Sequence, residues 1–131
     1  MRPKVTCGAI IKKGNKILLT KRNVAPYKGY WCMPGGHIKW GERTEEAIKR
    51  EVKEETGFNF QPKFFRYYDE IMPKIKWHAV ALFFVGKVTG SIKIDENEVK
   101  EFKWFSDREI GKLKLAFVNK KVLKDYFNWK K

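Results

Sequence analysis

Short runs of apolar and β-branched residues, separated by turn residues, dominate the pattern along this chain. Runs of this length, several of them alternating between apolar and polar positions, predict strands rather than helices. The Gly-Asn pair at 14–15 indicates a hairpin turn, the Pro-Gly-Gly sequence at 34–36 ends the third run, and the most apolar run, before the turn at 89–91, is expected to be central. The predicted strands are Val5–Lys12, Lys16–Arg22, Tyr30–Met33, Phe58–Met72, Trp77–Val88 and Glu101–Ser106.

Residues 44–56 carry the clearest helical pattern in the chain. Thr44 is a suitable N-cap, and Glu45 and Glu46 lie in the first turn, where the helix dipole favours negative charge. Gly57 follows the last residue and is typical of a helix C-terminus. We therefore expect a helix from Thr44 to Thr56.

A second helix is predicted near the C-terminus, where Val118, Val122 and Tyr126 recur every four residues, with Leu123 and Phe127 beside them. Strands, a helix, further strands and a closing helix make a mixed α/β order. No internal repeat, low-complexity tract or linker interrupts this order, so a single domain is expected over residues 1–131.

The composition excludes several protein classes. The 131 residues suit one compact domain, and a hydrophobic content of 43% supports a core, which excludes wholesale disorder. No apolar run approaches the roughly 18 residues needed to cross a bilayer, and none near the start is long enough for a signal peptide. Cys7 and Cys32 are too few for a disulfide framework, and both are expected to be buried. We therefore expect a soluble, cytoplasmic protein without membrane association.

The formal net charge of +14 is distributed unevenly. Residues 1–41 contain no Asp or Glu, whereas six of the 15 acidic residues fall within residues 42–55. A strongly basic protein attracts anions such as nucleotides or nucleic acids, although lysines that only solvate the surface give the same total. Neither explanation accounts for a cluster of carboxylates in a basic chain. The clustered residues are Glu42, Glu45, Glu46, Glu51, Glu54 and Glu55.

The last turns of the predicted helix concentrate negative charge on one face. At about 100° per residue, Glu51, Glu54 and Glu55 fall within an arc of roughly 100°. These carboxylates repel one another, and the helix dipole disfavours negative charge at this end. A bound cation would reverse both penalties, and oxygen ligands suit hard divalent ions such as Mg²⁺. The alternative is a solvated acidic face that neighbouring lysines and Arg50 balance.

The residues around this helix follow a defined spacing. Gly36 precedes Glu42 with five residues between them, and seven further residues lead to the segment REVKEETGF at 50–58. This arrangement resembles the Nudix box, Gly-x5-Glu-x7-Arg-Glu-U-x-Glu-Glu-x-Gly-U, where U is a bulky apolar residue, and every fixed position is met. The segment WCMPGG at 31–36, the opening hairpin, and Glu98 with WFS at 104–106 also look like this family, so the resemblance extends over nearly the whole chain.

The resemblance implies the fold and the reaction class of the Nudix (MutT-like) hydrolases. The fold would be an α/β/α sandwich with a mixed β-sheet and helices on both faces. Enzymes of this family hydrolyse a nucleoside diphosphate linked to another group, and water attacks one phosphorus of the pyrophosphate. One to three Mg²⁺ ions, with Mn²⁺ as a substitute, would neutralise the pyrophosphate, lower the pKa of a bound water and orient its attack.

The family's site residues carry over position by position. Glu42 and Arg50 would support the site through an ion pair, with Arg50 also holding Glu51, and a purely structural role for this pair stays open. Glu51 or Glu54 would in addition contribute to catalysis as a base. The metal ligands would be three helix carboxylates and one backbone carbonyl, from Glu51, Glu54, Glu55 and Gly36.

A base or further ligand from outside the box is common in the family. Glu98 is our candidate, because it precedes the predicted strand at 101–106. Asp95, Glu96 and Glu101 are rivals, and an exposed acidic loop without a catalytic role is the alternative.

The substrate is less clear from the residues. Arg22, Lys21 and Lys39 would meet phosphates if the end of the hairpin and the glycine-rich loop flank the site, although they could equally be surface charges. Most aromatic residues of a small domain belong to its core, but some could stack a nucleobase. Among these, Tyr30 is included in the predicted substrate site. The full aromatic set is Tyr27, Tyr30, Trp40, Tyr67, Tyr68 and Trp77.

Three functional hypotheses remain at this stage. The first is a Mg²⁺-dependent pyrophosphohydrolase, with nucleoside triphosphates slightly favoured as substrates over ADP-ribose, although Pro73 has a spacing that resembles the ADP-ribose-cleaving subgroup. The second is a hydrolase of RNA 5′ ends, which the charge of +14 would help to hold. The third is a non-catalytic RNA-binding domain on the same fold. The aromatic content is also compatible with a homodimer.

Overall fold

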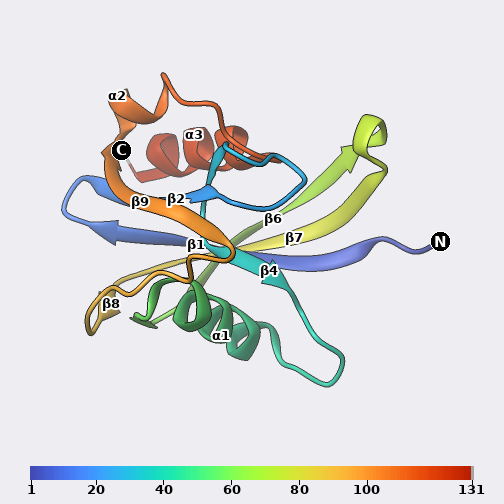
Figure 1. Ribbon diagram of the computed structural model, residues 1–131, viewed down its shortest axis with the longest axis horizontal. Helices are drawn as coiled ribbons and strands as arrows, with labels where there is room; N and C mark the ends of the chain where they lie inside the picture. The colour runs from blue at the N-terminus through green and yellow to red at the C-terminus, as the bar shows by residue number, and fades with distance from the viewer. Residues whose placement is uncertain (131) are drawn as a thin grey trace.

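The computed structural model describes residues 1–130, which fold around one mixed, seven-stranded β-sheet (Figure 1). The longest path through the sheet runs β3-β2-β1-β7-β6, while β4 pairs with β1 and β9 pairs with β2. β1 and β7 run parallel, and the other pairs are antiparallel. The strands of this sheet are β1 (Lys4–Lys13), β2 (Lys16–Arg22), β3 (Trp31–Cys32), β4 (Gly35–His37), β6 (Lys63–Met72), β7 (Trp77–Gly86) and β9 (Val99–Ser106).

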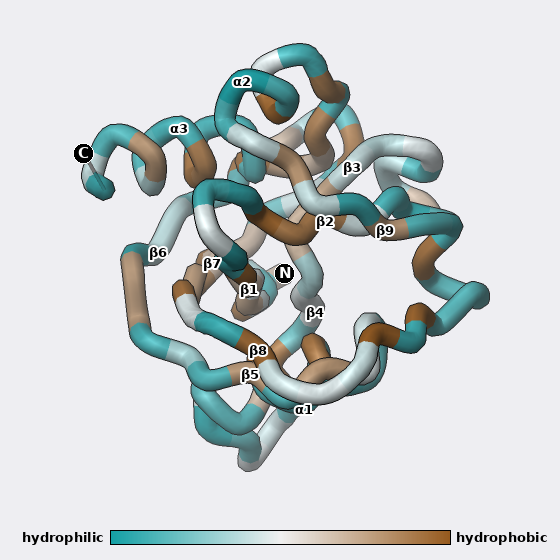
Figure 2. The backbone as a smooth tube through the Cα atoms, turned by 90° about the vertical axis from the view of Figure 1, so that its left-hand side faces the viewer, coloured by the Kyte–Doolittle hydropathy of each residue, from teal (hydrophilic) through white to brown (hydrophobic). Residues whose placement is uncertain are grey.

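Helices cover both faces of the sheet. Figure 1 shows α1 (Thr44–Thr56) on one face and α3 (Asn119–Lys130) on the opposite face. Alternate residues of β1 enter the two cores, since Ile10 packs on the side of α3 while Ala9 and Ile11 pack on the side of α1. Figure 2 shows the apolar middle strands between these helical layers. The α/β/α sandwich that the resemblance implied is therefore confirmed.

Several predicted elements match the structure closely. The predicted bounds of β2 and α1 are those observed, and β7 lies between β1 and β6, as expected for the most apolar strand. Cys7 and Cys32 are both buried, as predicted. No helix among residues 1–130 combines the length and the apolar character that crossing a bilayer requires.

The extended segment predicted over Phe58–Met72 is interrupted. It forms the short strand β5 (Asn59–Phe60) and then β6, because Pro62 between them has no backbone N–H to donate to a ladder. The predicted strand Trp77–Val88 likewise ends at Gly86, and β8 (Val88–Thr89) follows as the antiparallel partner of β5. Gly86 allows this arrangement because a Cβ there would overlap the carbonyl of Gln61.

Two local predictions were wrong. The segment at 34–36 does not simply end a strand, because Gly35 and Gly36 begin β4 and pair with β1. A Cβ on Gly35 would overlap the Cys7 carbonyl, so only glycine permits this close approach. The N-cap of α1 is Arg43 rather than Thr44, and the Arg43 backbone N–H donates to the Glu46 carboxylate at 3.0 Å.

The sequence patterns also left two short helices unpredicted, α2 (Asp107–Ile110) and the 3₁₀ helix η1 (Pro73–Ile75). Ser106 caps α2, since its hydroxyl accepts from the Glu109 N–H at 3.2 Å and its own N–H donates to the Glu109 carboxylate at 2.9 Å. This reciprocal pair is a capping box, a signal that the sequence contained.

Candidate active site

A cavity of about 630 Å³ opens beside β4 and α1, and most of the predicted site residues line it. Its volume lies within the range of small-molecule sites. We call one side the acidic wall, formed by Glu51, Glu54, Glu55 and Glu98. The aromatic wall is formed by Trp77, Phe83 and Phe117.

The three helix carboxylates of the acidic wall differ in burial. Glu55 is only 6% exposed, and its carboxylate accepts the backbone N–H of Gly35 at 3.2 Å. Burial and the negative charge of Glu51 raise the pKa of Glu55 well above its usual range. Glu51 is half-buried and Glu54 is exposed, so the helix presents one buried and two accessible carboxylates to the cavity.

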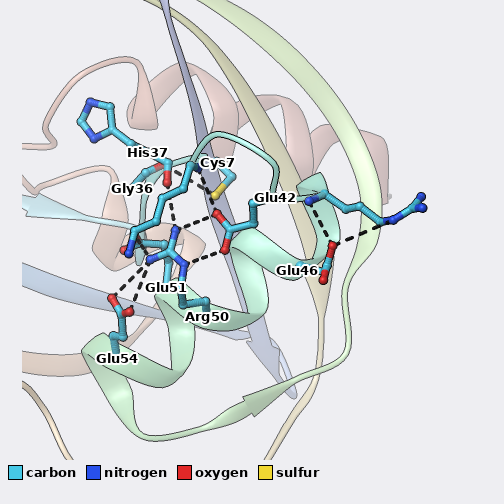
Figure 3. A network of polar contacts seen from close by, with 10 residues as sticks. Cys7, Gly36, His37, Glu42, Glu46, Arg50, Glu51 and Glu54 are labelled. Carbon is cyan, nitrogen blue, oxygen red and sulfur yellow. Dashed lines mark hydrogen bonds and ion pairs between the residues drawn. The ribbon is translucent and has the colours of Figure 1, made fainter.

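Arg50 organises the carboxylates around it (Figure 3). Its guanidinium donates twice to Glu42, at 2.7 and 3.0 Å, and once to Glu51, at 2.8 Å. It also donates to the His37 carbonyl at 3.0 Å and approaches Glu54 at 3.3 Å. Hydrogen bonds from Arg50 and from the Lys39 backbone lower the pKa of Glu42 to about 2. The expected ion pair between Glu42 and Arg50 is thus present, and Arg50 also holds Glu51.

Gly36 lies directly against the Glu51 carboxylate. A Cβ at position 36 would stand 2.6 Å from the carboxylate atoms of Glu51, so any side chain there would displace Glu51. The Gly36 carbonyl accepts a long hydrogen bond from the Cys7 thiol at 3.6 Å, and burial raises the pKa of that thiol to about 12. The glycine of the motif is therefore needed for space beside a carboxylate.

The acidic wall has the chemistry of a divalent-cation site. Its carboxylates repel one another, and Gly36 leaves a cradle that a Cβ would fill. Within residues 1–130, no three acidic, histidine or cysteine side chains converge closely enough to enclose a metal ion. Arg50 explains this arrangement, because its guanidinium bonds to Glu51 and approaches Glu54 from the position between them.

Glu98 lies on the loop before β9 and lines the same cavity. Partial burial, followed by the negative charges of Glu51, Asp95 and Glu54, raises its pKa. Its three rivals are outside the lining of this cavity. Asp95 and Glu96 border a shallow neighbouring hollow, and Glu101 approaches Lys21 at 4.0 Å. The structure thus brings Glu98, and not Glu101, to the helix carboxylates.

Of the three basic residues predicted to contact phosphates, the structure places only two at the cavity. Arg22 and Lys39 line the cavity, whereas Lys21 faces Glu101. The Arg22 guanidinium donates to the Pro26 carbonyl at 2.7 Å and lies 5.2 Å from the centre of the Phe117 ring.

Tyr30 is outside the cavity lining. Its ring packs edge-on against Tyr27 at 5.3 Å, and Tyr27 in turn packs against Phe117 at 4.9 Å. A direct role of Tyr30 in substrate binding stays a prediction without support from the cavity. Of the predicted aromatic residues, Trp77 is the one that lines the cavity.

Sequence reasoning missed much of the aromatic wall. Phe117 packs against Trp77 with ring centres 4.9 Å apart and has a positive φ of 51°, which is uncommon for a bulky residue. Beside it, the buried carboxylate of Glu70 accepts from Trp77 Nε1 at 3.0 Å and from the Val118 N–H at 3.3 Å. No motif surrounds Phe117, so only the tertiary structure identifies it.

The comparisons with known proteins agree with this geometry. The model of the NUDIX domain matches residues 1–126. The ADP-ribose pyrophosphatase of Methanocaldococcus jannaschii is 37% identical over 99% of this chain and 76% of its own length. The NAD-capped RNA hydrolase NudC of Haemophilus influenzae is 33% identical over 78% of this chain, which spans only 40% of that relative.

Among solved structures, the MutT NUDIX hydrolase of Burkholderia pseudomallei superposes with a TM-score of 0.86 and 29% identity. The superposition covers 95% of this chain and 98% of that one. Sequence and fold therefore point to the same family over almost the full length described.

Proposed function

The chain belongs to the Nudix hydrolase family. We propose that it hydrolyses the pyrophosphate bond of a nucleoside diphosphate derivative and that ADP-ribose is its substrate. The observation that carries this proposal is the placement of four carboxylates on one wall of a cavity that is also lined by Arg22 and three aromatic residues. ADP-ribose is chosen because the Methanocaldococcus relative is named for it and because Pro73 has the spacing of that subgroup.

The acidic wall would hold Mg²⁺, or Mn²⁺ in its place, through the carboxylates of Glu51, Glu54 and Glu55 and the Gly36 carbonyl. Nudix hydrolases as a family need a divalent metal, and oxygen ligands of this kind suit either ion. When bound, the cation neutralises the pyrophosphate and lowers the pKa of an attacking water. Arg50 would keep the Glu51 carboxylate on the cavity side by holding it against Glu42.

Glu98 would accept the proton of the attacking water. It lines the same cavity as the helix carboxylates, and its raised pKa makes it a better proton acceptor near neutral pH than an ordinary glutamate. Attack at one phosphorus breaks the bridging P–O bond, and the bridging oxygen leaves with the other phosphate. With ADP-ribose the products are AMP and ribose 5-phosphate.

The remaining cavity residues would bind the rest of the substrate. Arg22 and Lys39 carry positive charge to the cavity and would contact phosphate oxygens. The rings of Trp77 and Phe117 offer an apolar surface on which a nucleobase can stack. The polar groups of the substrate would thus lie at the acidic wall and its flat apolar part at the aromatic wall.

Nucleoside triphosphates and RNA 5′ ends stay as rival substrates. The net charge of +14 and the similarity to NudC, itself named for NAD-capped RNA, favour testing RNA alongside free nucleotides. A non-catalytic RNA-binding domain is the remaining alternative. The complete set of motif carboxylates argues against this alternative, because a domain that had lost its catalytic function would also have lost one of these metal ligands.

The test is product release from a panel of ADP-ribose, nucleoside triphosphates, NAD-capped RNA and 5′-triphosphate RNA, with Mg²⁺, with Mn²⁺ and with chelator. The Glu54→Gln variant controls for contaminating phosphatases. We expect metal-dependent conversion of ADP-ribose to AMP that the variant loses. A triphosphate or an RNA cleaved with higher kcat/KM would replace ADP-ribose as the substrate. No cleavage of any panel member, together with salt-dependent RNA binding, would favour the binding domain.

A further inference from the structure

The loop before β9 is attached to two neighbouring elements, the end of β2 and the C-terminal end of α1, and Asn23 makes the attachment to β2. The Asn23 backbone N–H donates to the Glu98 carbonyl at 2.9 Å, and its side-chain Nδ2 donates to the Glu96 carbonyl at 3.0 Å. Asn23 follows Arg22, the last residue of β2, and is half-buried. Two successive contacts therefore join the end of β2 to the residues around Glu98.

On the other side, the loop is attached to the C-terminal end of α1 through its backbone. The Lys93 N–H donates to the Thr56 carbonyl at 2.6 Å, and the Asp95 N–H donates to the Glu55 carbonyl at 3.2 Å. These bonds satisfy carbonyls that the end of a helix leaves without partners. Across residues 1–130, the Asn23 amide makes the only side-chain hydrogen bond that reaches residues 91–98 from another part of the chain.

The pairing of β2 with β9 changes register next to Asn23. Lys21 lies opposite Glu101, but Arg22 lies opposite Val99, so Lys100 is left out of the ladder as a β-bulge. In an uninterrupted ladder Lys100 would lie opposite Arg22 and on the cavity face, because facing residues of an antiparallel pair share a face. Instead Val99 is buried there and lines the cavity, while Lys100 is exposed.

We propose that Asn23 is a positioning residue for the hydrolysis reaction: it holds the bulged register, so that Val99 rather than Lys100 lies opposite Arg22 and Glu98 stays at the cavity with the helix carboxylates. The inference rests on the proposed function, in which Glu98 accepts a proton from water. Bulges next to active sites commonly re-aim a side chain. If β9 slipped by one residue along β2, the positive charge of Lys100 would move toward the carboxylates that are needed for a metal ion.

The first test is a kinetic double-mutant cycle with Asn23→Ala and Glu98→Gln. Asn23→Ala is expected to lower kcat about tenfold with KM nearly unchanged, because the substrate contacts remain and only the placement of the base is lost. In the Glu98→Gln variant, adding Asn23→Ala should not lower kcat any further. Asn23→Asp keeps the shape of the side chain but removes its donor, and it should behave like Asn23→Ala.

Asn15→Ala, in the turn at the other end of β2, is the matched control and should leave kcat unchanged. An equal loss from Asn23→Ala with and without Glu98 would overturn the proposal, because Asn23 would then act independently of Glu98. An unchanged kcat in Asn23→Ala, with Glu98→Gln strongly impaired, would also overturn it.

The second test does not depend on activity. Amide hydrogen exchange at Glu98 and Val99, both of which donate to the Asp95 carbonyl, should become at least tenfold faster in Asn23→Ala than in the wild type. Unchanged exchange would show that Asn23 does not hold the loop. Faster exchange together with full activity of Glu98→Gln would instead show that the proposed base is wrong, and the catalytic role of Asn23 would be rejected with it.

Discussion

The two walls of the cavity are built in different ways. Three of the four acidic-wall carboxylates come from five consecutive residues of α1, residues 51–55. The aromatic wall combines Trp77 and Phe83 of β7 with Phe117 from the loop before α3. One wall is thus a local feature of a single helix, and the other exists only because separate segments of the chain meet.

The walls also differ in how well their polar groups are satisfied. Burial and neighbouring negative charges raise the pKa of Glu55 and of Glu98, and Arg50 is the cation that contacts Glu51. Beside the aromatic wall, by contrast, both oxygens of Glu70 accept protein hydrogen bonds. Among the carboxylates that line the cavity, those of the acidic wall raise one another's pKa through like charge, whereas the pKa of Glu70 is raised by burial. Repelling negative charge therefore lies at the wall where a cation and a pyrophosphate would bind, and changes in the two walls should affect different kinetic constants.

The largest effect is expected from removing a carboxylate of the acidic wall. Glu54→Gln keeps the shape of the side chain but removes its charge, and it should lower kcat about a thousandfold, equivalent to about 4 kcal/mol of transition-state stabilisation. Steady-state kinetics under saturating Mg²⁺ measures this. Glu45→Gln, exposed in the first turn of the same helix, is the matched control and should retain wild-type kcat. If both variants were equally active, the acidic wall would not be the catalytic one.

A smaller loss should follow from displacing a carboxylate without removing it. In Gly36→Ala the new methyl group would stand 2.6 Å from the Glu51 carboxylate and push it aside, and kcat should fall about a hundredfold. The Mg²⁺ concentration for half-maximal activity should rise as well. At Gly111 a Cβ would meet only an ordinary contact of 3.5 Å, so Gly111→Ala should behave as the wild type. A normal metal requirement in Gly36→Ala would contradict this account of Gly36.

Changes in the aromatic wall should alter KM rather than kcat. Phe117→Leu removes a flat ring at the cavity and should raise KM about tenfold, at the lower end of what base stacking contributes. The value of kcat should change less than twofold, because the acidic wall is untouched. Phe102→Leu, on β9 and outside the cavity lining, is the control. A loss in kcat with unchanged KM would show that the two walls are not functionally separate.

The smallest effect concerns stability and its dependence on pH. The pKa of Glu42 is lowered to about 2 in the folded chain, against about 4.3 for an unperturbed glutamate. The contacts of Glu42 with Arg50 therefore stabilise the fold fully at pH values above about 4.3. This stabilisation should disappear as the pH falls from about 4.3 to about 2. Glu42→Gln should therefore lower the Tm by a few degrees at pH 7 and by little near pH 2.

Thermal unfolding followed by circular dichroism over this pH range measures the difference. Glu45→Gln serves again as the control, since its carboxylate makes no hydrogen bond or ion pair in the part of the chain that the structure describes. A Tm difference for Glu42→Gln that stayed constant from pH 7 to pH 2 would show that the ion pair with Arg50 does not stabilise the fold.

Local patterns predicted what depends on neighbouring residues. The helix over Thr44–Thr56 was predicted to the residue, because the periodic burial of Ile48 and Val52 and the glycine at its end are all local signals. The helix carboxylates and their Arg50 network belong to the same stretch of chain. The resemblance to the Nudix box added Gly36 and Glu42, and the predicted ion pair of Glu42 with Arg50 is the one observed.

What the patterns missed depends on contacts between distant segments. The strand β4 forms because two glycines let the chain approach β1, although the sequence Pro-Gly-Gly is typical of a turn. Nothing near Phe117 in the sequence indicates a wall of a cavity, and Tyr30 was placed in the substrate site although it packs outside the cavity lining. The bulge at Lys100 was likewise invisible, because register is a property of two strands together.

The sequence by itself determined which groups are the candidates for the chemistry, because the acidic face of a helix and the spacing of a motif are set by residues close to one another in the chain. Only the tertiary structure decided how those groups are enclosed: which glutamate outside the motif faces them, which aromatic rings complete the cavity, and which lysine is kept away. Burial, strand register and the field of neighbouring charges arise from segments far apart in the sequence, and no local pattern encodes them.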